Sequence, residues 1–388
     1  MTRTTMATMT IVVASLLTRT SLSDPDPRAT VLVTPNDGLY AMAPTVFESA
    51  VVAESLEEAR NVARKLRQSK STVDVFLLPG VHRLVRTLDL GPEDSGVHWQ
   101  STDTLRPAVV SGGTRITGWA RHSTRRELFV APAPKALREA ATPIRQLWVN
   151  DLRAERPYIY IPGNLTNITA GFDFSRSGLN PSKWANPTHV EFIFHVRWWT
   201  QSRCTVASVS GHTVKLKQPC ILDVTAYQGQ RAPYNQLCDV HGGYPIPGTA
   251  CGVAYIENVR QNLTRPGQFY YDKAAEQVLY FPRQGETLGS VEASAVTSLL
   301  ETLLHVNGTQ QASWQGVQYS HSTWTVPNTP GGYVESQAGF SQNYNGCNAT
   351  STRAACRAFV NGDGCGNTTR YPDSCIARRG REPVGYKI

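Results

Sequence analysis

The chain has 388 residues, of which 40% are hydrophobic and 18% charged, a balance that is ordinary for a globular protein and excludes wholesale disorder. The net charge of +8 comes from 38 basic and 30 acidic residues, with arginine-rich stretches at 121–126 and 378–381. This excess would attract an acidic polysaccharide, or it would form an ordinary solvated basic surface. No nucleic-acid-binding motif accompanies it, so we expect no nucleic-acid partner.

The N-terminus has the pattern of a secretory signal peptide. Arg3 precedes an apolar core over 9–17, and small residues follow at Ser21 and Ser23. This core is far shorter than the roughly 20 residues needed to cross a bilayer. We therefore predict a signal peptide over 1–23, a secreted or cell-surface location, and no membrane span.

Glycosylation sequons and cysteines favour the same secretory route. Asn-X-Ser/Thr occurs at Asn164, Asn167, Asn262, Asn307, Asn348 and Asn367. The eight cysteines, an even number that fits disulfides in an oxidising compartment, are Cys204, Cys220, Cys238, Cys251, Cys347, Cys356, Cys365 and Cys375. Pairing of sequence neighbours (204–220, 238–251, 347–356, 365–375) is the simplest of 105 connectivities. A zinc site is disfavoured because the sequence has no Cys-X-X-Cys pair.

The first expected elements are a strand over 29–36 and an amphipathic helix from Leu56 to about Gln68. Ser55 and Glu58 form a capping box that would satisfy free backbone N–H groups at the helix start. One face of this helix is apolar and consists of Leu56, Ala59, Ala63 and Leu66. A single helix ahead of stacked strands suits a cap that covers the open end of the stack, a structural role without chemistry.

Three short apolar runs follow the helix, at 73–78, 84–90 and 108–110. Each is rich in Val, Leu, Phe or Ala and ends at Gly or Pro, which predicts strands rather than helices. Because no helical segment separates them, we interpret them as successive edges of a coiled β-solenoid. The alternative is an ordinary β-sandwich.

The pattern changes after Trp119. A strand is expected over 145–150, and apolar residues alternate with polar ones from His189 to Trp199, as in an antiparallel strand with two different faces. Two hairpins are expected, 205–209 with 213–216 and 268–271 with 278–281. Strands at 299–306 and 312–319 then resume the earlier pattern.

These patterns divide the chain into five parts. We predict the signal peptide over 1–23, a capping helix with the first coils over 24–124, an inserted antiparallel β module over 125–288, a return to the coils over 289–340, and an irregular cysteine-rich tail over 341–388.

An ordered series of motifs resembles large right-handed parallel β-helix proteins of glycoside hydrolase family 141. The series consists of LLPGVHRL, LDLGPEDSG, RPAVVSGGTRITGW, RQLWVNDLRAERPY, NLTRPGQFYYDKAAEQVLYFPRQGE and GGYVESQAGF, all between residues 29 and 340. The resemblance implies an all-β fold of the pectin-lyase type, a right-handed parallel β-helix with an early β-rich insertion. It also implies carbohydrate processing, with fucosidase- and xylanase-type activities known in the family.

The chain departs from the family after Phe340, since family members are usually longer and their proposed catalytic acids lie on later coils. We therefore expect a fragment that lacks the later catalytic coils. Hydrolysis of a glycosidic bond usually needs two carboxyl groups. The acids in the solenoid-like parts are Glu93, Asp94, Asp103, Glu292, Glu301 and Glu335.

Glu335 has the surroundings best suited to a sugar, with Trp324, Tyr333 and Gln337 as candidate substrate-binding residues. An exposed corner carboxylate without chemistry is the alternative for Glu335. The Glu93-Asp94-Ser95-Gly96 stretch instead predicts a turn in which Asp94 bonds its own backbone. We expect no cofactor and no metal site.

Two functions from different classes follow. The first is a secreted glycoside-hydrolase-like protein, a monomer, that acts on complex polysaccharide and, if active, hydrolyses O-glycosyl bonds. The second is a non-catalytic carbohydrate-binding or cell-surface adhesion protein on the same scaffold. A pectate-lyase-like enzyme would need a Ca²⁺ site of clustered acids, and no such cluster is evident in the sequence.

Overall fold

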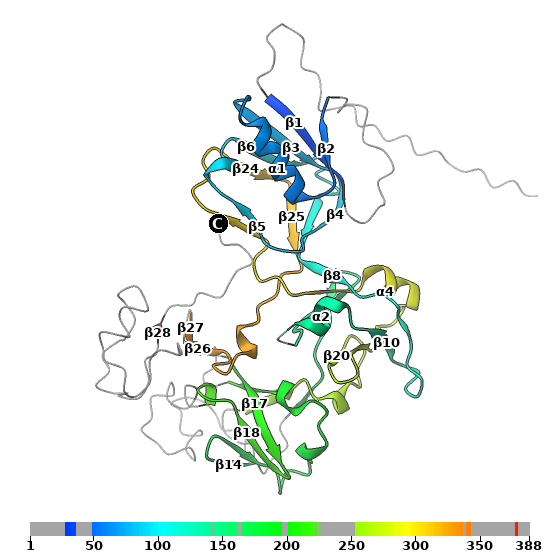
Figure 1. Ribbon diagram of the computed structural model, residues 1–388. Helices are drawn as coiled ribbons and strands as arrows, with labels where there is room; N and C mark the ends of the chain where they lie inside the picture. The colour runs from blue at the N-terminus through cyan, green and yellow to red at the C-terminus, as the bar shows by residue number, and fades with distance from the viewer. Residues whose placement is uncertain are drawn as a thin grey trace, which may run out of the picture.

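The protein is predominantly β, with parallel sheets at one end and antiparallel sheets elsewhere (Figure 1). The computed structural model describes residues 28–35, 49–140, 143–160, 165–195, 201–221, 224, 253–336, 339–342 and 377–378. The described sheets enclose three main hydrophobic cores. We call them the N-terminal core, around Trp99, the central core, around Phe129, and the insertion core, around Phe172.

Parallel strands in three sheets surround the N-terminal core. The sheets have the orders β2-β1-β3-β6-β24, β25-β7-β4 and β23-β5. Their strands are β1 (Arg28–Val33), β2 (Val51–Ala53), β3 (Thr72–Leu77), β4 (Gly80–Arg83), β5 (Leu88–Leu90), β6 (Val97–Ser101), β7 (Ala108–Ser111), β23 (Leu304–Val306), β24 (Ser313–Gln315) and β25 (Val317–Ser320). The chain visits all three sheets in turn through β3, β4 and β5, and β6 and β7 then return to the first two in parallel register.

The second of the three expected strands in this region was wrong in its bounds. A strand occupies Gly80–Arg83, where a turn was expected, and only Leu88–Leu90 of the run 84–90 is a strand. Gly80 has φ +130°, and a Cβ there would lie 2.9 Å from Pro35. The glycine therefore lets the chain turn and re-enter a sheet at once, which an apolar-run pattern does not reveal.

The expected helix is present as α1 (Leu56–Leu66), and Leu56, Ala59 and Ala63 are buried in the N-terminal core. The Ser55 hydroxyl accepts a hydrogen bond from the Glu58 N–H at 3.1 Å. The Glu58 carboxylate, however, accepts from the N–H of Glu54 rather than from that of Ser55, so the predicted capping box is only half formed.

The Glu93–Gly96 turn fastens the outer face of α1. The Asp94 carboxylate accepts a hydrogen bond from the Gly91 N–H at 2.7 Å, as the sequence predicted. It also accepts hydrogen bonds from Arg64 Nε at 2.7 Å and from Arg64 Nη2 at 2.6 Å. Such a bidentate pair fixes the rotation of the helix over the sheet.

Two four-stranded antiparallel sheets, β20-β21-β10-β9 and β12-β11-β22-β8, form the central core. Their strands are β8 (Gly113–Arg115), β9 (Ala120–Arg121), β10 (Phe129–Pro132), β11 (Leu147–Val149), β12 (Leu152–Arg153), β20 (Phe269–Asp272), β21 (Gln277–Tyr280) and β22 (Val296–Ser298). The β20–β21 hairpin was expected from the sequence. Two short helices, α2 (Lys135–Glu139) and α4 (Leu288–Ser294), were not, because neither is long enough to show helical periodicity.

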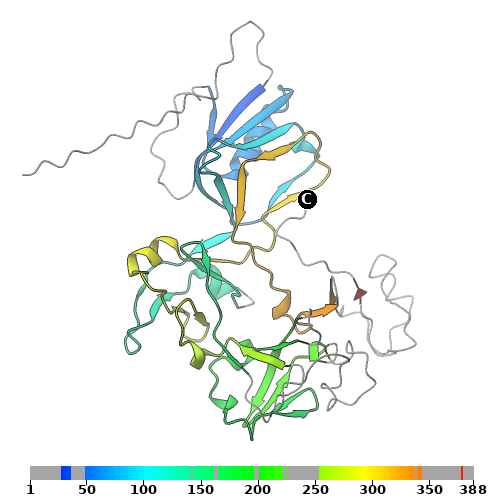
Figure 2. The same cartoon turned by 180° about the vertical axis from the view of Figure 1, so that it is seen from behind.

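The third body is a seven-stranded antiparallel sheet, which we call the insertion sheet, in the order β13-β19-β16-β17-β18-β15-β14. Its strands are β13 (Tyr158–Tyr160), β14 (Thr166–Ile168), β15 (Gly171–Asp173), β16 (Glu191–Phe194), β17 (Ser202–Ser210), β18 (Thr213–Leu216) and β19 (Val253–Glu257). The expected hairpin of 205–209 with 213–216 is confirmed as β17–β18. The insertion sheet and the parallel sheets lie at opposite ends of the described structure in both views (Figures 1 and 2).

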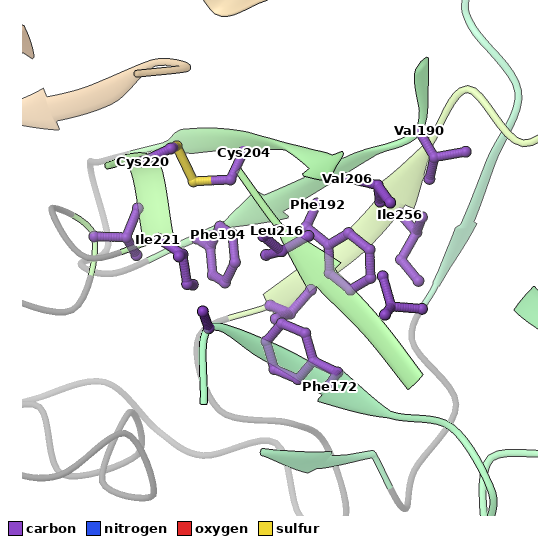
Figure 3. Close-up of a cluster of buried hydrophobic side chains, with 14 of the residues drawn as sticks. Phe172, Val190, Phe192, Phe194, Cys204, Val206, Leu216, Cys220, Ile221 and Ile256 are labelled. Carbon is purple, nitrogen blue, oxygen red and sulfur yellow. A yellow bond between two sulfur atoms is a disulfide. The ribbon is translucent and has the colours of Figure 1, made fainter. Parts of the chain in front are cut away.

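Aromatic side chains and one disulfide fill the insertion core (Figure 3). Phe172 and Phe192 stack with centroids 5.2 Å apart. Cys204 and Cys220 form a disulfide, which confirms the first pair of the predicted sequential pattern. The other six cysteines lie outside the described residues.

The remaining elements are short. They are the 3₁₀ helices η2 (Pro92–Asp94), η3 (Pro181–Lys183), η4 (Pro187–His189), η6 (Arg260–Asn262) and η7 (Val326–Asn328), and the strands β26 (Val334–Ser336), β27 (Gly339–Gln342) and β28 (Ala377–Arg378). Within the part of the chain that the structure describes, no helix combines the length and the apolar character needed to cross a bilayer.

Trp99 offers a test of the N-terminal core. Its ring is 1% exposed and stacks on Trp314 of the neighbouring parallel strand, with centroids 4.6 Å apart and planes within 1°. We expect Trp99→Ala to lower the free energy of unfolding by about 3–5 kcal/mol, because it removes the ring and leaves a cavity. Urea denaturation measures this change. Leu105→Ala, at a side chain that is 93% exposed, is the control and should change stability by less than about 0.5 kcal/mol. Equal effects of the two substitutions would contradict the stack as a core element.

Candidate functional site

The two faces of the insertion sheet carry different side chains. Phe192 and Ile256 point into the insertion core. Because side chains alternate along a strand, Glu191, Glu257 and Arg203 point to the opposite side, which we call the polar face. Glu191 and Glu257 are directly paired between β16 and β19, so their carboxylates come from adjacent positions.

Three arginines surround the two glutamates on the polar face; we call these five residues the arginine–glutamate cluster. Arg145 donates to Glu191 Oε1 at 2.5 Å and to Oε2 at 3.0 Å. Arg156 donates to the same two oxygens at 3.0 and 2.8 Å. Arg156 and Arg203 both donate to Glu257 as well. The side chains of Glu191 and Arg156 are 2% and 5% exposed, so these charges are paired almost without water.

The cluster keeps both carboxyl groups ionised. Burial by itself would raise the pKa of Glu191, but Arg145 and Arg156 overcome that effect and hold it well below the usual value. The pKa of Glu257 is likewise lowered, against burial, by Arg156 and Arg203. Burial also opposes the charge of Arg156, yet the two carboxylates raise its pKa. A general acid needs a raised carboxyl pKa, so these two glutamates have the wrong character to protonate a leaving group.

The arginine–glutamate cluster connects parts of the chain that lie far apart in sequence. Arg145 precedes β11 of the central core, whereas Glu191 belongs to the insertion sheet. Arg145 also donates to the Asn328 side-chain oxygen at 2.7 Å, and the Asn328 amide donates to the Pro143 carbonyl at 3.0 Å. The cluster therefore links the segment around η7 and the residues that precede β11 to the insertion sheet.

This returning segment carries the sugar-binding residues expected from the sequence. The rings of Trp324 and Tyr333 meet edge to face, with centroids 5.2 Å apart. Tyr333 exchanges two backbone hydrogen bonds with Arg203, at 2.7 and 2.9 Å. Because paired residues share one side of a sheet, Tyr333 lies on the polar face with Arg203, while Val334 enters the insertion core. The structure thus brings Trp324 and Tyr333 together.

Glu335, the predicted catalytic acid, lies in β26 and pairs with Phe340 of β27. Its side chain is outside the described part of the structure, as is the whole of Gln337. The roles of both residues therefore remain predictions.

Gly332 explains how the returning segment approaches the sheet so closely. Its φ is +57°, and a Cβ at this position would lie 2.3 Å from the Arg203 carbonyl oxygen and 2.5 Å from Cys220 Sγ. Only glycine fits such a contact. The Cys204–Cys220 disulfide therefore lies directly beneath the Trp324–Tyr333 segment.

The other acids considered in the sequence serve local structure. Asp94 pairs with Arg64, and Asp103 with Arg106. Glu292 accepts the backbone N–H groups of Gly118 and Trp119, which lowers its pKa. Each of the remaining two makes a surface contact, Glu93 with Arg64 and Glu301 with Thr325.

The perturbed carboxyl groups of the described residues are all shifted in the same direction. All those whose pKa is shifted, namely Asp103, Glu127, Asp173, Glu191, Glu257 and Glu292, have a lowered pKa. The described residues contain no group of three or more His, Cys, Asp or Glu side chains that could hold a metal ion.

Sequence reasoning missed the arginine–glutamate cluster. The sequence placed Glu191 on the polar side of an alternating strand, and the structure shows that it is buried. A polar residue in an alternating strand can face water, or it can be covered by another segment of the chain. Which of the two occurs depends on whether the fold places charged partners over that face. The nearest signal was the density of arginine and glutamate in the RQLWVNDLRAERPY motif, which supplies Arg145 and Arg156.

Comparison with known proteins supports a glycoside-hydrolase-like fold. Neither the family models nor the curated proteins include a match to this sequence. A solved structure described as a glycoside hydrolase is similar, with a TM-score of 0.57 and 20% sequence identity. The similarity covers 82% of this chain and 55% of the glycoside hydrolase, so the chain spans about half the length of that protein.

The arginine–glutamate cluster makes a strong prediction for stability. Glu191→Gln removes one carboxylate and leaves Arg145 and Arg156 buried with one partner fewer. We expect a loss of about 3–5 kcal/mol in the free energy of unfolding, measured by urea denaturation near neutral pH. Glu139→Gln is the control, since the Glu139 side chain is 66% exposed and its removal should cost less than about 0.5 kcal/mol. A Glu191→Gln protein as stable as this control would show that the cluster contributes nothing.

The same cluster predicts a loss of stability in acid. Glu191 and Glu257 have folded-state pKa values below the value of about 4.3 for a glutamate in the unfolded chain. Their contribution is therefore present above about pH 4.3 and is lost as the pH falls toward the folded-state values, by up to about 1.4 kcal/mol per pH unit for each group. Urea midpoints measured from about pH 7 down to about pH 3 should show this decline. Glu191→Gln should make the decline shallower, and an unchanged slope would contradict the assignment.

Proposed function

We propose that this protein is a secreted, glycan-directed protein of the glycoside-hydrolase type, built on a right-handed parallel β-helix like that of glycoside hydrolase family 141. The observation that carries the proposal is the structural likeness to a solved glycoside hydrolase over 82% of the chain. Its ligand would be a complex polysaccharide of plant, algal or microbial origin.

The parallel sheets support the β-helix part of the proposal. Strands β3 to β5 would form one coil, and β6 and β7 the start of the next. The returning strands β23, β24 and β25 stack in parallel on β5, β6 and β7 respectively, as a further coil would. The Trp99–Trp314 stack between neighbouring coils is what in-register repetition produces.

The domain organisation follows from this scaffold. Helix α1 would cap the coils over 24–124, and the antiparallel module over 125–288 would be an insertion. The coils would resume over 289–340. The antiparallel pairing of β8 with β22 supports an insertion, because it places the chain's exit and return side by side.

Secretion is supported by the disulfide, because such bonds persist in oxidising compartments. Two predicted glycosylation asparagines have described side chains. Asn307 is exposed after β23, and Asn262 is half-buried in η6. Asn167 lies in β14 with its side chain outside the description, and Asn164, Asn348 and Asn367 fall outside it altogether.

Carbohydrate binding without catalysis is the second candidate function. It is favoured by one observation, the lowered pKa of each perturbed carboxyl group in the described residues. The two functions differ in one measurable respect, since only a hydrolase releases new reducing ends from the glycan.

The test of hydrolysis uses the full chain and a panel of plant, algal and microbial polysaccharides. If the protein hydrolyses one of them through Glu335, we expect Glu335→Gln to lower the rate of reducing-end release by about 10²–10⁴-fold. Binding of the same glycan should persist in this variant, and Glu139→Gln should behave like the wild-type protein. Undiminished release by Glu335→Gln would remove Glu335 from the mechanism. Binding without any release would select the second candidate, and neither binding nor release would overturn both.

A further inference from the structure

The exposed end of the polar face carries three tyrosines, which we call the tyrosine platform. Tyr158 and Tyr160 belong to β13, the edge strand of the insertion sheet, and Tyr255 belongs to the adjacent β19. The Tyr158 ring lies 5.5 Å from that of Tyr160 and 5.6 Å from that of Tyr255, between ring centroids. Tyr160 is 72% exposed. Tyr158 and Tyr255 are half-buried. An exposed aromatic ring supported by two more rings at a sheet edge is suited to receive a ligand.

The buried cluster fixes one ring of the tyrosine platform, that of Tyr255. Arg203, which is paired with Glu257, donates to the side-chain oxygen of Gln201 at 3.0 Å. The Gln201 amide in turn donates to the Tyr255 hydroxyl at 3.2 Å. A ring fixed in this way loses little conformational entropy when a ligand binds to it.

Two exposed arginines form no salt bridge with a carboxylate of the described residues: Arg265, which lies beside the platform, and Arg153, which lies near the arginine–glutamate cluster. The guanidinium carbon of Arg265 lies 4.1 Å from the centroid of the Tyr158 ring, and the residue is exposed. Arg153 is also exposed, and its charge interacts with those of Arg156, Arg203 and Glu257. An arginine that stacks on an aromatic ring keeps its N–H groups available for an anion.

The local charge favours an anionic ligand. Five arginines in and around the polar face (Arg145, Arg153, Arg156, Arg203 and Arg265) stand against three glutamates (Glu155, Glu191 and Glu257). The excess is positive, and the two arginines without carboxylate partners are the ones at the surface. Guanidinium groups bind carboxylate and sulfate oxygens through paired hydrogen bonds.

We propose that the tyrosine platform is a binding site for an acidic glycan, with a sugar ring lying on the exposed Tyr160, beside Tyr158 and Tyr255, and the anionic groups bound by Arg265. The C–H faces of a sugar pack against aromatic rings, and an anion on a neighbouring unit reaches the guanidinium group. This inference rests on the proposed function for the identity of the ligand as a glycan. It adds a charge preference and a location separate from the Trp324–Tyr333 pair.

The test measures binding of three oligosaccharides of equal length to the full chain by isothermal titration calorimetry. They are an oligogalacturonate, which carries carboxylates, a sulfated galactan, and a neutral xylo-oligosaccharide. We expect at least one anionic ligand to bind about tenfold or more tightly than the neutral one, with affinity that falls as salt is added. The ratio between the two anionic ligands identifies the preferred group.

Two substitutions locate the site. Tyr160→Ala and Arg265→Gln should each weaken binding of the anionic ligand by about tenfold, with urea midpoints equal to that of the wild type. Arg106→Gln is the matched control, because it removes the same charge from a side chain that is 60% exposed in the N-terminal body. It should leave affinity unchanged.

The outcomes separate this inference from the proposed function. Acidic-glycan binding that survives Tyr160→Ala and Arg265→Gln but is lost in Trp324→Ala would overturn the platform and leave the proposed function standing. Equal affinity for neutral and anionic ligands would overturn the charge preference alone. Absence of binding to any glycan, together with no reducing-end release, would overturn the proposed function and the inference with it.

Discussion

The contacts of Glu191 with Arg145 and Arg156 are the constraint on which the placement of the insertion sheet depends. These charges are buried, so each costs free energy unless all its partners stay in place. The partners come from the start of the central sheet, from the entry to β13 and from the middle of the insertion sheet. Through Asn328 the same network holds the segment that leaves the module toward β26. One set of ion pairs thus fixes where the insertion sheet lies relative to the central core.

The two ends of the molecule differ in the direction of their strands: the sheets are parallel at one end and antiparallel at the other. In the N-terminal body, parallel strands stack in register and bury a continuous apolar core, with α1 packed against the first of them. In the insertion sheet, antiparallel strands place one face against an aromatic core and carry the arginine–glutamate cluster on the other. The pairing of β8 with β22 lies in the central core, where the chain leaves the N-terminal strands after β7 and returns to them before β23. A polar face held rigidly from below is a suitable base for surface recognition.

The pKa values of Glu191 and Glu257 are shifted in the direction expected of structural acids rather than of a catalytic general acid. A glycosidase needs one carboxyl group that stays protonated near neutral pH. The buried glutamates of this protein have the opposite property, because their arginine partners keep them ionised. These glutamates instead help to fix a surface side chain. Arg203, which pairs with Glu257, donates to Gln201, and Gln201 donates to the Tyr255 hydroxyl. A glycoside-hydrolase-like fold thus carries, on its insertion sheet, a surface ordered by buried ion pairs, and our proposal of glycan recognition starts from this combination.

The sequence by itself determined the features that depend on neighbours in the chain. It predicted helix α1, the β17–β18 and β20–β21 hairpins, the Asp94 turn and the Cys204–Cys220 pair, because periodicity, turn residues and short loop closure act over a few residues. It missed β4, α2 and α4, which are too short to show a period. Only the tertiary structure decided the burial of Glu191, whose arginine partners lie 46 and 35 residues away, and the contact of Arg156 with Glu257, 101 residues away. Whether a polar side chain in an alternating strand meets water or a buried guanidinium depends on what the fold packs against that face, and strand periodicity carries no information about it.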